Sequence, residues 1–191
     1  MTETELVRQV LNGNQHACRF LVAKYQNLVN HMVRRIVLRD TYAEDICQDV
    51  FLKVFRQIKG YRGDSRLSTW IATIAYNTSI TYVKKKKVRN EAGFDLIGLT
   101  NLPQEGSIES VDSIESEEIK RILLKTIETI PVHYRSLLTL FYLEEFSYLE
   151  IEKITGMPEG TVKSYLFRAR SILKCKLEKI QENERTPVFA K

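Results

Sequence analysis

Residues 147–170 read SYLEIEKITGMPEGTVKSYLFRAR, and this stretch decides the fold of the C-terminal half of the chain. Ser147, followed three positions later by Glu150, forms a capping-box pattern that predicts the start of a short helix. Gly156 stands where a left-handed residue commonly ends such a helix, and a last helix is predicted over about 159–179. Two helices joined by a tight glycine turn are typical of a helix-turn-helix motif.

The last predicted helix has a narrow apolar stripe and a polar, basic face. The stripe consists of Val162, Leu166, Ala169 and Leu173. The opposite side carries Ser164, Phe167, Arg168 and Ser171, flanked by Lys163 and Lys174. Arg can bind guanine through two parallel hydrogen bonds, Phe can contact thymine methyl groups and Lys can meet phosphate. The pattern therefore favours docking in a DNA major groove over an ordinary pair of helices with a solvated face.

The charge divides the chain into three parts. Residues 1–89 carry 16 basic and 7 acidic side chains, and residues 119–191 carry 13 and 9. Between them, residues 90–118 hold eight acidic side chains and no Lys or Arg. This middle stretch lacks a sustained apolar period and is interpreted as a flexible acidic linker between two basic helical domains. It is either a solvated loop or an anionic segment that threads a positively charged channel of a nucleic-acid machine.

The two domains contain further predicted helices. In the second domain, one helix is marked by the apolar residues from Ile119 to Ile130 and another spans about Val132 to Glu144. In the first domain, Asn14 can cap a helix that runs to about Ile36. The next helix, from about Tyr42 to Ile58, has a core stripe of Ala43, Cys47, Val50, Val54 and Ile58.

The side of this helix opposite the core stripe is acidic and carries one exposed leucine. Its members, at i, i+3, i+4 and i+7, are Asp45, Gln48, Asp49 and Leu52. A leucine among carboxylates gains nothing from solvent, so the face is interpreted as a docking surface for helices of another protein, slightly ahead of a plain solvated face. The Asp45 and Asp49 pair could instead hold a divalent metal in a nuclease, but no His or further acid accompanies it.

Residues 61–70 read YRGDSRLSTW and form a predicted polar loop, with Ser68 as the expected N-cap of a third helix over 69–87. One side of that helix combines Trp70, Thr73, Asn77, Thr81 and Lys84, ahead of a run of lysines, Lys84 to Lys87, and Arg89. A ring that stacks, an amide that reads a base edge and lysines that meet phosphate together suit an unstacked nucleic-acid strand. Two alternatives stay open: Trp70 belongs to the core, and the lysines complement the helix C-terminus.

Other chemistry is not indicated. The chain has no run of about 18 apolar residues, so no membrane insertion is expected and a soluble cytoplasmic protein is predicted. Its three cysteines show no metal-binding spacing, and its three histidines accompany no recognisable nucleophile and acid. The lack of such arrangements predicts a protein that is not an enzyme and needs no cofactor or metal. The composition, poor in Gly and Pro, predicts an all-α fold.

These segments resemble a known family, the bacterial RNA polymerase sigma factors of the extracytoplasmic-function type (group IV of the sigma-70 family). Residues 42–52, YAEDICQDVFL, are similar to its sigma region 2. Arg62-Gly63-Asp64-Ser65 with Ser68-Thr69-Trp70 resembles its promoter-melting segment. Residues 160–164 and 167–170 resemble the recognition helix of its region 4. The resemblance covers about 14–89 and 119–178, with the three motifs in the family's order.

The resemblance implies a division of labour between two domains. Residues 1–89 would bind polymerase and capture a flipped base of the minus-10 element, and residues 119–180 would read the minus-35 element, with a frayed tail over 181–191. Polymerase binding, at the clamp helices, is expected at Asp45, Gln48, Asp49 and Leu52. Minus-10 contacts are expected at Arg62, Asp64, Ser65, Ser68, Trp70, Asn77, Lys84 and Lys85, and minus-35 contacts at Thr161, Lys163, Ser164, Phe167 and Arg168. The partners implied are core RNA polymerase, promoter DNA and an anti-sigma factor.

Two other classes compete with this reading. A two-domain regulator that binds DNA by itself would require a palindromic site and a self-pairing apolar face. A nucleic-acid enzyme would require magnesium-dependent cleavage through Asp45 and Asp49.

Overall fold

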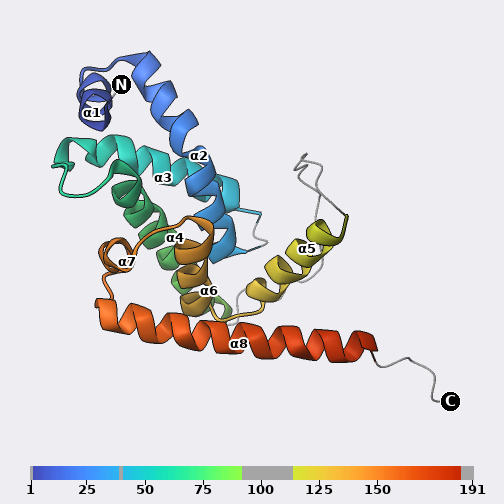
Figure 1. Cartoon of the computed structure of the whole chain (residues 1–191). Coiled ribbons are helices and arrows are strands. Elements are labelled where there is room, and N and C mark those ends of the chain that lie inside the picture. The colour runs from blue at the N-terminus through green and yellow to red at the C-terminus, as the bar shows by residue number, and fades with distance from the viewer. Residues whose placement is uncertain (1, 39–40, 92–113, 186–191) are drawn as a thin grey trace.

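The computed structural model describes the backbone of residues 2–38, 41–91 and 114–185, and every regular element within these ranges is helical (Figure 1). The all-α prediction is confirmed. The N-terminal half contains α1 (Glu3–Leu11), α2 (Gln15–Val37), α3 (Ala43–Gln57) and α4 (Leu67–Glu91), with a 3-10 turn at Ile58–Gly60. The C-terminal half contains α5 (Ile114–Glu128), α6 (Val132–Leu138), α7 (Tyr148–Thr155) and α8 (Glu159–Arg185), with a π-helical turn at Thr139–Leu143 after α6.

Helix α2 is the centre of the N-terminal half and packs against α1, α3 and α4. It begins as predicted, because the Asn14 side chain accepts hydrogen bonds from the backbone N–H groups of His16 and Ala17 at 2.9 and 3.2 Å. Helix α1 was not predicted from the sequence. Thr2 caps it through the N–H of Glu5, and its apolar side, with Leu6 buried, covers one end of α2.

Helix α4 lies between the two halves of the molecule. It packs against α2 and α3 on one side and against α7 on the other (Figure 1). Its first three turns are therefore buried on several sides, as shown by Leu67, Ile71, Ala72, Ala75 and Ser79, which have no measurable exposure. A helix enclosed in this way needs small and apolar residues around most of its circumference, which explains why its sequence has no clean amphipathic period.

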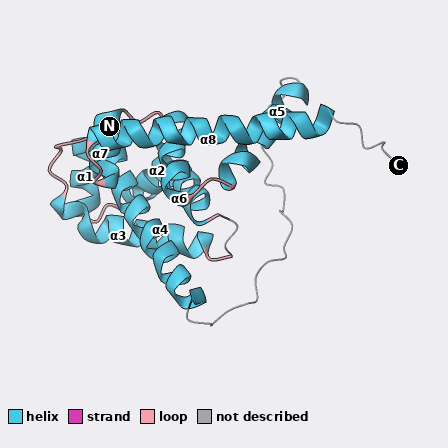
Figure 2. Cartoon of the chain, turned by 90° about the horizontal axis from the view of Figure 1, so that it is seen from below, coloured by secondary structure: helices cyan, strands magenta, loops and turns pink. Residues whose placement is uncertain are grey.

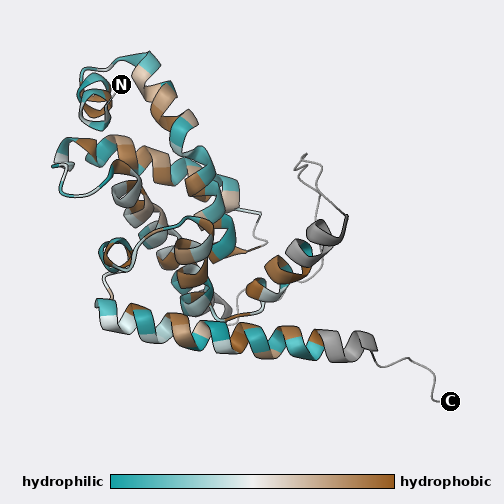
Figure 3. Ribbon diagram, in the orientation of Figure 1, coloured by the Kyte–Doolittle hydropathy of each residue, from teal (hydrophilic) through white to brown (hydrophobic). Residues whose placement is uncertain are grey.

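Helix α8 forms the base of the C-terminal half. Helices α6 and α7 pack on its N-terminal part, and α5 lies along its other end (Figures 1 and 2). Polar and apolar residues alternate in bands along α8 (Figure 3), and its inward stripe contains the buried Val162, Leu166 and Ala169 that the sequence predicts. Leu173 is half-buried at the end of the same stripe.

Several helix ends differ from the sequence-based boundaries. Helix α4 continues to Glu91 and α5 begins at Ile114, so both ends of the expected 90–118 linker lie in helices. Helix α8 continues to Arg185, so its last turns include residues expected to fray. The rest of the expected linker, 92–113, and of the expected tail, 186–191, lies outside the described residues. Among the helices that are described, none combines the length and hydrophobicity required to cross a membrane.

The helix-turn-helix motif has the local geometry expected from its sequence. Ser147 and Glu150 form the complete capping box, in which each side chain bonds the other residue's backbone N–H. Gly156 ends α7 with φ of +72° and donates its N–H to the carbonyl of Glu152 at 2.8 Å. The left-handed conformation favours glycine because a Cβ atom crowds the following carbonyl.

A pair of glycine substitutions tests this turn. Gly156→Ala is expected to reduce the free energy of unfolding by about 1 kcal/mol because of its positive φ alone, since a Cβ atom there would meet nothing within 4 Å. Gly160→Ala is the matched control: it also has open space around it but lies in the first turn of α8, where alanine is the better helix former. Thermal unfolding followed by circular dichroism should therefore show opposite shifts, and equal losses would contradict the assigned role of the turn.

Candidate nucleic-acid interface

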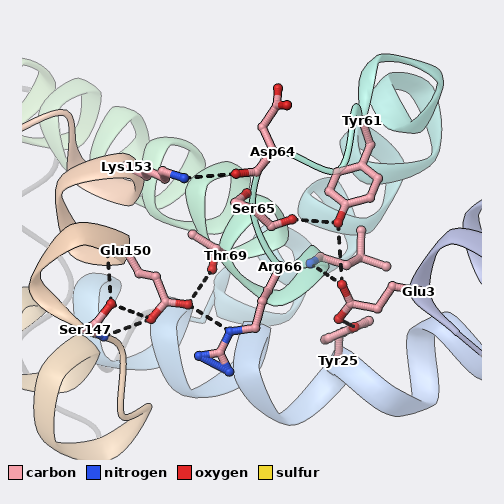
Figure 4. Close-up of polar contacts among 11 residues, drawn as sticks. Glu3, Tyr25, Tyr61, Asp64, Ser65, Arg66, Thr69, Ser147, Glu150 and Lys153 are labelled. Atoms are coloured by element: carbon pink, nitrogen blue, oxygen red, sulfur yellow. Dashed lines mark hydrogen bonds and ion pairs between the residues drawn. The ribbon is translucent and has the colours of Figure 1, made fainter.

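A short loop, residues 61–66, connects the 3-10 turn to α4 and projects charged side chains. Arg62, Asp64 and Arg66 are exposed, and Gly63 takes a left-handed φ of +81° at the bend. The Tyr61 hydroxyl donates to the backbone carbonyl of Ser65 at 2.7 Å and so fixes the loop across its base (Figure 4). The loop residues assigned to minus-10 DNA are thus brought together on one projecting turn.

The start of α4 corrects one sequence-based assignment. Ser68 was expected to cap this helix, but α4 begins at Leu67, and Ser68 lies inside the first turn. The acceptor for the Leu67 N–H is instead the carboxylate of Glu3, at 2.9 Å (Figure 4). The serine followed by a helical pattern gave a plausible local cap, but the residue that accepts the bond comes from α1.

The expected nucleic-acid face of α4 extends from this loop along the helix. Trp70 is half-buried, with its ring edge-to-face against Tyr61 at a centroid distance of 5.7 Å, so it is partly a core residue. Asn77, Lys84 and Lys85 are exposed. A single face therefore leads from the loop to the lysines, with the aromatic ring nearest the loop.

The acidic face of α3 is exposed along its whole length. Asp45, Gln48 and Asp49 are all exposed, and the Leu52 side chain beside them keeps 51% of its surface in solvent. Within the described residues, no group of three or more His, Cys, Asp or Glu side chains is placed to hold a metal ion. These exposed side chains lie opposite the buried core stripe of the same helix.

The outward face of α8 is exposed and partly engaged with its own helix. Phe167 is 70% exposed, and Arg168 is exposed beside it. Lys163 forms a 2.6 Å ion pair with Glu159, whose hydrogen bond and charge raise the pKa of Lys163. Because this pair is at the surface, it can exchange for a phosphate at little cost.

Two more residues of the expected minus-35 face, Thr161 and Ser164, lie near the N-terminal end of α8. The Ser164 hydroxyl donates to the backbone carbonyl of Thr161 at 2.9 Å. Tyr165, which lies to the side of this face, packs edge-to-face on Tyr134 at 5.4 Å. The face presented to solvent thus consists of the residues assigned to DNA, while Tyr165 serves packing.

Helix α7 contacts the loop that precedes α4. The Glu150 carboxylate accepts hydrogen bonds from the Arg66 guanidinium at 3.0 Å and the Thr69 hydroxyl at 3.1 Å (Figure 4). Lys153, one turn further on, donates to the backbone carbonyl of Asp64 at 3.0 Å. Burial alone would raise the pKa of Glu150, but hydrogen bonds from Ser147, Arg66 and Thr69 outweigh it and hold the pKa below its ordinary value.

A buried arginine joins the two halves behind this contact. Arg135, only 7% exposed, donates from Nε to the backbone carbonyl of Arg35 and from Nη2 to that of Ile36 at 2.7 Å. Its Nη1 donates to the carbonyl of Ile130 at 3.0 Å. The role of Arg135 was not predicted from the sequence, because helical periodicity concerns apolar spacing and two of the carbonyls that this arginine bonds are 99 and 100 residues away.

A further ion pair crosses the same seam. His31 Nδ1 lies 3.0 Å from the Glu144 carboxylate, whose pKa is raised by burial despite the opposing hydrogen bond and charge of His31. The seam contains a cavity of about 410 Å³, lined by Tyr25, Leu28, Arg66, Ser68, Glu144, Glu145 and Phe146. The structure thus brings the 61–66 loop against the helix-turn-helix unit, whereas the exposed faces of α3 and α8 remain separate surfaces.

Comparison with known proteins gives two family matches. Residues 21–89 match the model for Sigma-70 region 2, and residues 120–173 match the model for Sigma-70, region 4. The chain is 35% identical over 183 residues to the ECF RNA polymerase sigma-E factor of Escherichia coli (strain K12), which covers 93% of this chain and 95% of that protein. It is 34% identical over 184 residues to the protein of the same name from Haemophilus influenzae, with 93% and 96% covered.

Solved structures share the fold. CnrH, in complex with the cytosolic domain of CnrY, has a TM-score of 0.64 at 19% identity and covers 91% of this chain and 96% of its own. The sigma factor RpoE of Bartonella quintana, in complex with the anti-sigma factor NepR, has a TM-score of 0.64 at 23% identity, with 84% and 96% covered.

The pH dependence of stability tests the contact between Glu150 and the loop. Glu150→Gln removes the charge and one of the two acceptor oxygens, so the amide oxygen can keep the bonds from Ser147 while the amide nitrogen faces the donors of Arg66 and Thr69. We expect the free energy of unfolding to fall by about 1 kcal/mol, because the arginine is largely solvated. Since the folded pKa is depressed, this contribution is present above the ordinary pKa of a glutamate and disappears as the pH falls through the lower folded value. Denaturant unfolding between pH 7 and pH 3 measures the difference between the variant and the wild type.

The control is Glu152→Gln, which makes the same chemical change on the same helix. Its free energy of unfolding is not expected to approach that of the wild type as the pH falls, in contrast to the Glu150→Gln variant. If the difference in the free energy of unfolding between Glu150→Gln and the wild type were constant from pH 7 to pH 3, the charge-based explanation would be contradicted.

Proposed function

Because this chain belongs to the extracytoplasmic-function sigma factors of the sigma-70 family, we propose that it is an alternative sigma factor that directs promoter-specific transcription initiation. It binds core RNA polymerase and promoter DNA. The observation that carries the proposal is the presence of three surfaces with exposed charged side chains: the acidic face of α3, the loop before α4, which α7 contacts through Glu150 and Lys153, and the basic face of α8.

Each surface has a distinct role in the proposal. The acidic face, with Asp45, Gln48, Asp49 and Leu52, docks on the clamp helices of polymerase. The loop and the adjoining α4 face capture a flipped base of the minus-10 element, where stacking and base-edge contacts offset an unstacking cost of a few kcal/mol. Lys84 and Lys85 neutralise phosphates, and the α8 face reads the minus-35 element in the major groove.

Reading both elements requires the two halves to separate. The 25 base pairs between positions minus-35 and minus-10 span about 85 Å of duplex at 3.4 Å each. Helix α8, the longest element with 27 residues, is only about 40 Å long. The 22 residues 92–113 can span at most about 75 Å, so together with the domains they are long enough to bridge this distance. The structure, with α7 against the minus-10 loop, then corresponds to the state before promoter binding.

The remaining assignments follow from the same function. The nucleotide chemistry belongs to the polymerase, so the chain supplies no catalytic group and works in the cytoplasm with the enzyme. Its domains are residues 1–89 and 119–180, joined by the acidic segment. An anti-sigma factor is the expected protein partner, as in the complex of RpoE with NepR.

Run-off transcription with purified core polymerase tests the proposal. Addition of the chain should give transcripts with one mapped start on its promoters, and random or absent starts would contradict it. Asp49→Lys should weaken core binding at least about 10-fold, because it places a cation on a surface proposed to be complementary to basic helices.

The matched control for this variant is Glu44→Lys, which makes the same charge change at an exposed position of the same helix, about 140° from Asp49 around the axis but one turn from Gln48, at the rim of the proposed docking face. It should bind core polymerase within about 3-fold of the wild type, because a rim charge mainly alters the association rate. If both variants lose affinity equally, docking does not depend on the α3 face.

Two DNA-binding variants should fail in different ways. Arg168→Ala should lose about 1–3 kcal/mol of discrimination at one upstream base, with little effect on other positions. The double change of Lys84 and Lys85 to Ala should weaken binding to all sequences and reduce the slope of log affinity against log salt by about 2. Holoenzyme binding to wild-type and base-substituted promoters at several salt concentrations distinguishes them. An identical, sequence-independent loss in both variants would refute the assigned roles.

A further inference from the structure

The first turn of α4 has no capping residue of its own. Leu67, its first residue, is fully buried, and its N–H has no acceptor within the helix. Arg66, which precedes it, carries only donors, and Ser68 is already inside the turn. A buried N–H without an acceptor is strongly unfavourable, so the helix can begin here only if another element supplies one.

Helix α1 supplies that acceptor through Glu3. One carboxylate oxygen accepts from the Leu67 N–H at 2.9 Å, and the other accepts from the Tyr25 hydroxyl at 3.4 Å (Figure 4). Tyr25 is only 5% exposed, and its pKa is raised by burial and by the nearby Glu3 charge, so it remains a donor at all ordinary pH values. The negative charge also lies at the positive end of the α4 dipole.

The same carboxylate reaches the other end of the loop. The Tyr61 hydroxyl lies 3.5 Å from Glu3 and 2.7 Å from the carbonyl of Ser65. A phenol has one proton, and the shorter contact to Ser65 takes it, so the Glu3 contact is the weaker of the two. Glu3 is therefore within reach of both ends of the loop: of Tyr61, its first residue, and of Leu67, the residue that follows it. Glu3 and Leu67 are 64 residues apart in the sequence.

We propose that Glu3 is a positioning residue for base capture. It joins the two ends of the 61–66 loop and so holds Arg62, Asp64 and the Trp70 ring in the arrangement that receives the minus-10 base. The proposal rests on the proposed function and adds a residue that lies outside the family match to region 2, which begins at residue 21. A loop held in its bound conformation loses less conformational entropy when it binds, so the effect of Glu3 is on affinity for the strand.

The test uses holoenzyme made with core polymerase and a fluorescent single-stranded oligonucleotide that carries the minus-10 sequence mapped by run-off transcription. Glu3→Ala should bind this strand at least about 10-fold more weakly than the wild type, because the loop is no longer preorganised. Glu3→Gln should remain within about 3-fold, because its amide oxygen still accepts from Leu67 and its amide nitrogen can donate to the Tyr25 oxygen. Core affinity and minus-35 duplex affinity should be unchanged in both.

Glu5→Ala is the matched control. Glu5 is an acidic residue in the same first turn of α1, and among the described residues its carboxylate makes no hydrogen bond to the loop. It should bind the strand within about 2-fold of the wild type, because the cap on α4 is intact. A general weakening of α1 would instead lower the strand affinity of both variants.

The outcomes separate the two proposals. If wild-type holoenzyme does not bind the strand, the proposed function fails. If the wild type binds and Glu3→Ala binds equally well, or if core, duplex and strand affinities fall in parallel, the positioning role of Glu3 is wrong. Should Glu3→Ala fail to fold, Glu3→Asp replaces it: this variant keeps the charge, but its side chain is one methylene shorter and no longer reaches both the Leu67 N–H and the Tyr25 hydroxyl. A strand affinity equal to the wild type would then overturn the proposal.

Discussion

The Arg135 guanidinium is the interaction on which the arrangement of the two halves depends. It is buried, and it donates to the carbonyls of Arg35 and Ile36 at the end of α2 and of Ile130 before α6. Carbonyls in the last turn of a helix have no donor within the helix, and a cation there is favoured by the helix dipole. Burial lowers the pKa of Arg135, but an arginine side chain remains charged in any accessible pH range. One side chain therefore fixes α6 against α2 and, through the short segment to α7, places α7 against α4.

The contacts beyond this arginine suit an interface that opens. Hydrogen bonds and ion pairs cross the seam between the two halves. They include Arg66 with Glu150, Lys153 with the Asp64 carbonyl and His31 with Glu144. Such groups exchange a protein partner for water at a small net cost, whereas the apolar side chains inside each half would lose far more. Separation would also uncover the α4 surface that α7 covers and the acceptors of Arg135, so it requires a partner that binds only the separated form and shifts the population toward it.

The features predicted from the sequence are those determined within three or four residues. The Asn14 cap, the Ser147 capping box and the Gly156 turn are each encoded by neighbours along the chain, and the structure has all three. The two features that were missed join distant segments: Glu3 on the start of α4, and Arg135 on the end of α2. In a sequence, a backbone group without a local partner shows only as a helix end that lacks a good capping residue. The sequence does not say which distant side chain forms the hydrogen bond to it. The exposed faces were predictable because helical periodicity alone separates them from the core.

Exposure of the surfaces indicates an order of events during initiation. The acidic face of α3 is exposed in the structure, so the polymerase docking proposed for it requires no rearrangement of the chain. The loop before α4 is instead engaged by Glu150, which bonds Arg66 and Thr69 with the same charge-assisted hydrogen bonds that a phosphate would make. Contact of a strand with Arg66 would therefore require displacement of this carboxylate, whereas Arg62 on the same loop is already exposed. In the proposed function, docking through α3 can therefore precede separation of the halves, because the α3 face is already exposed, whereas reading both promoter elements at once has to follow separation.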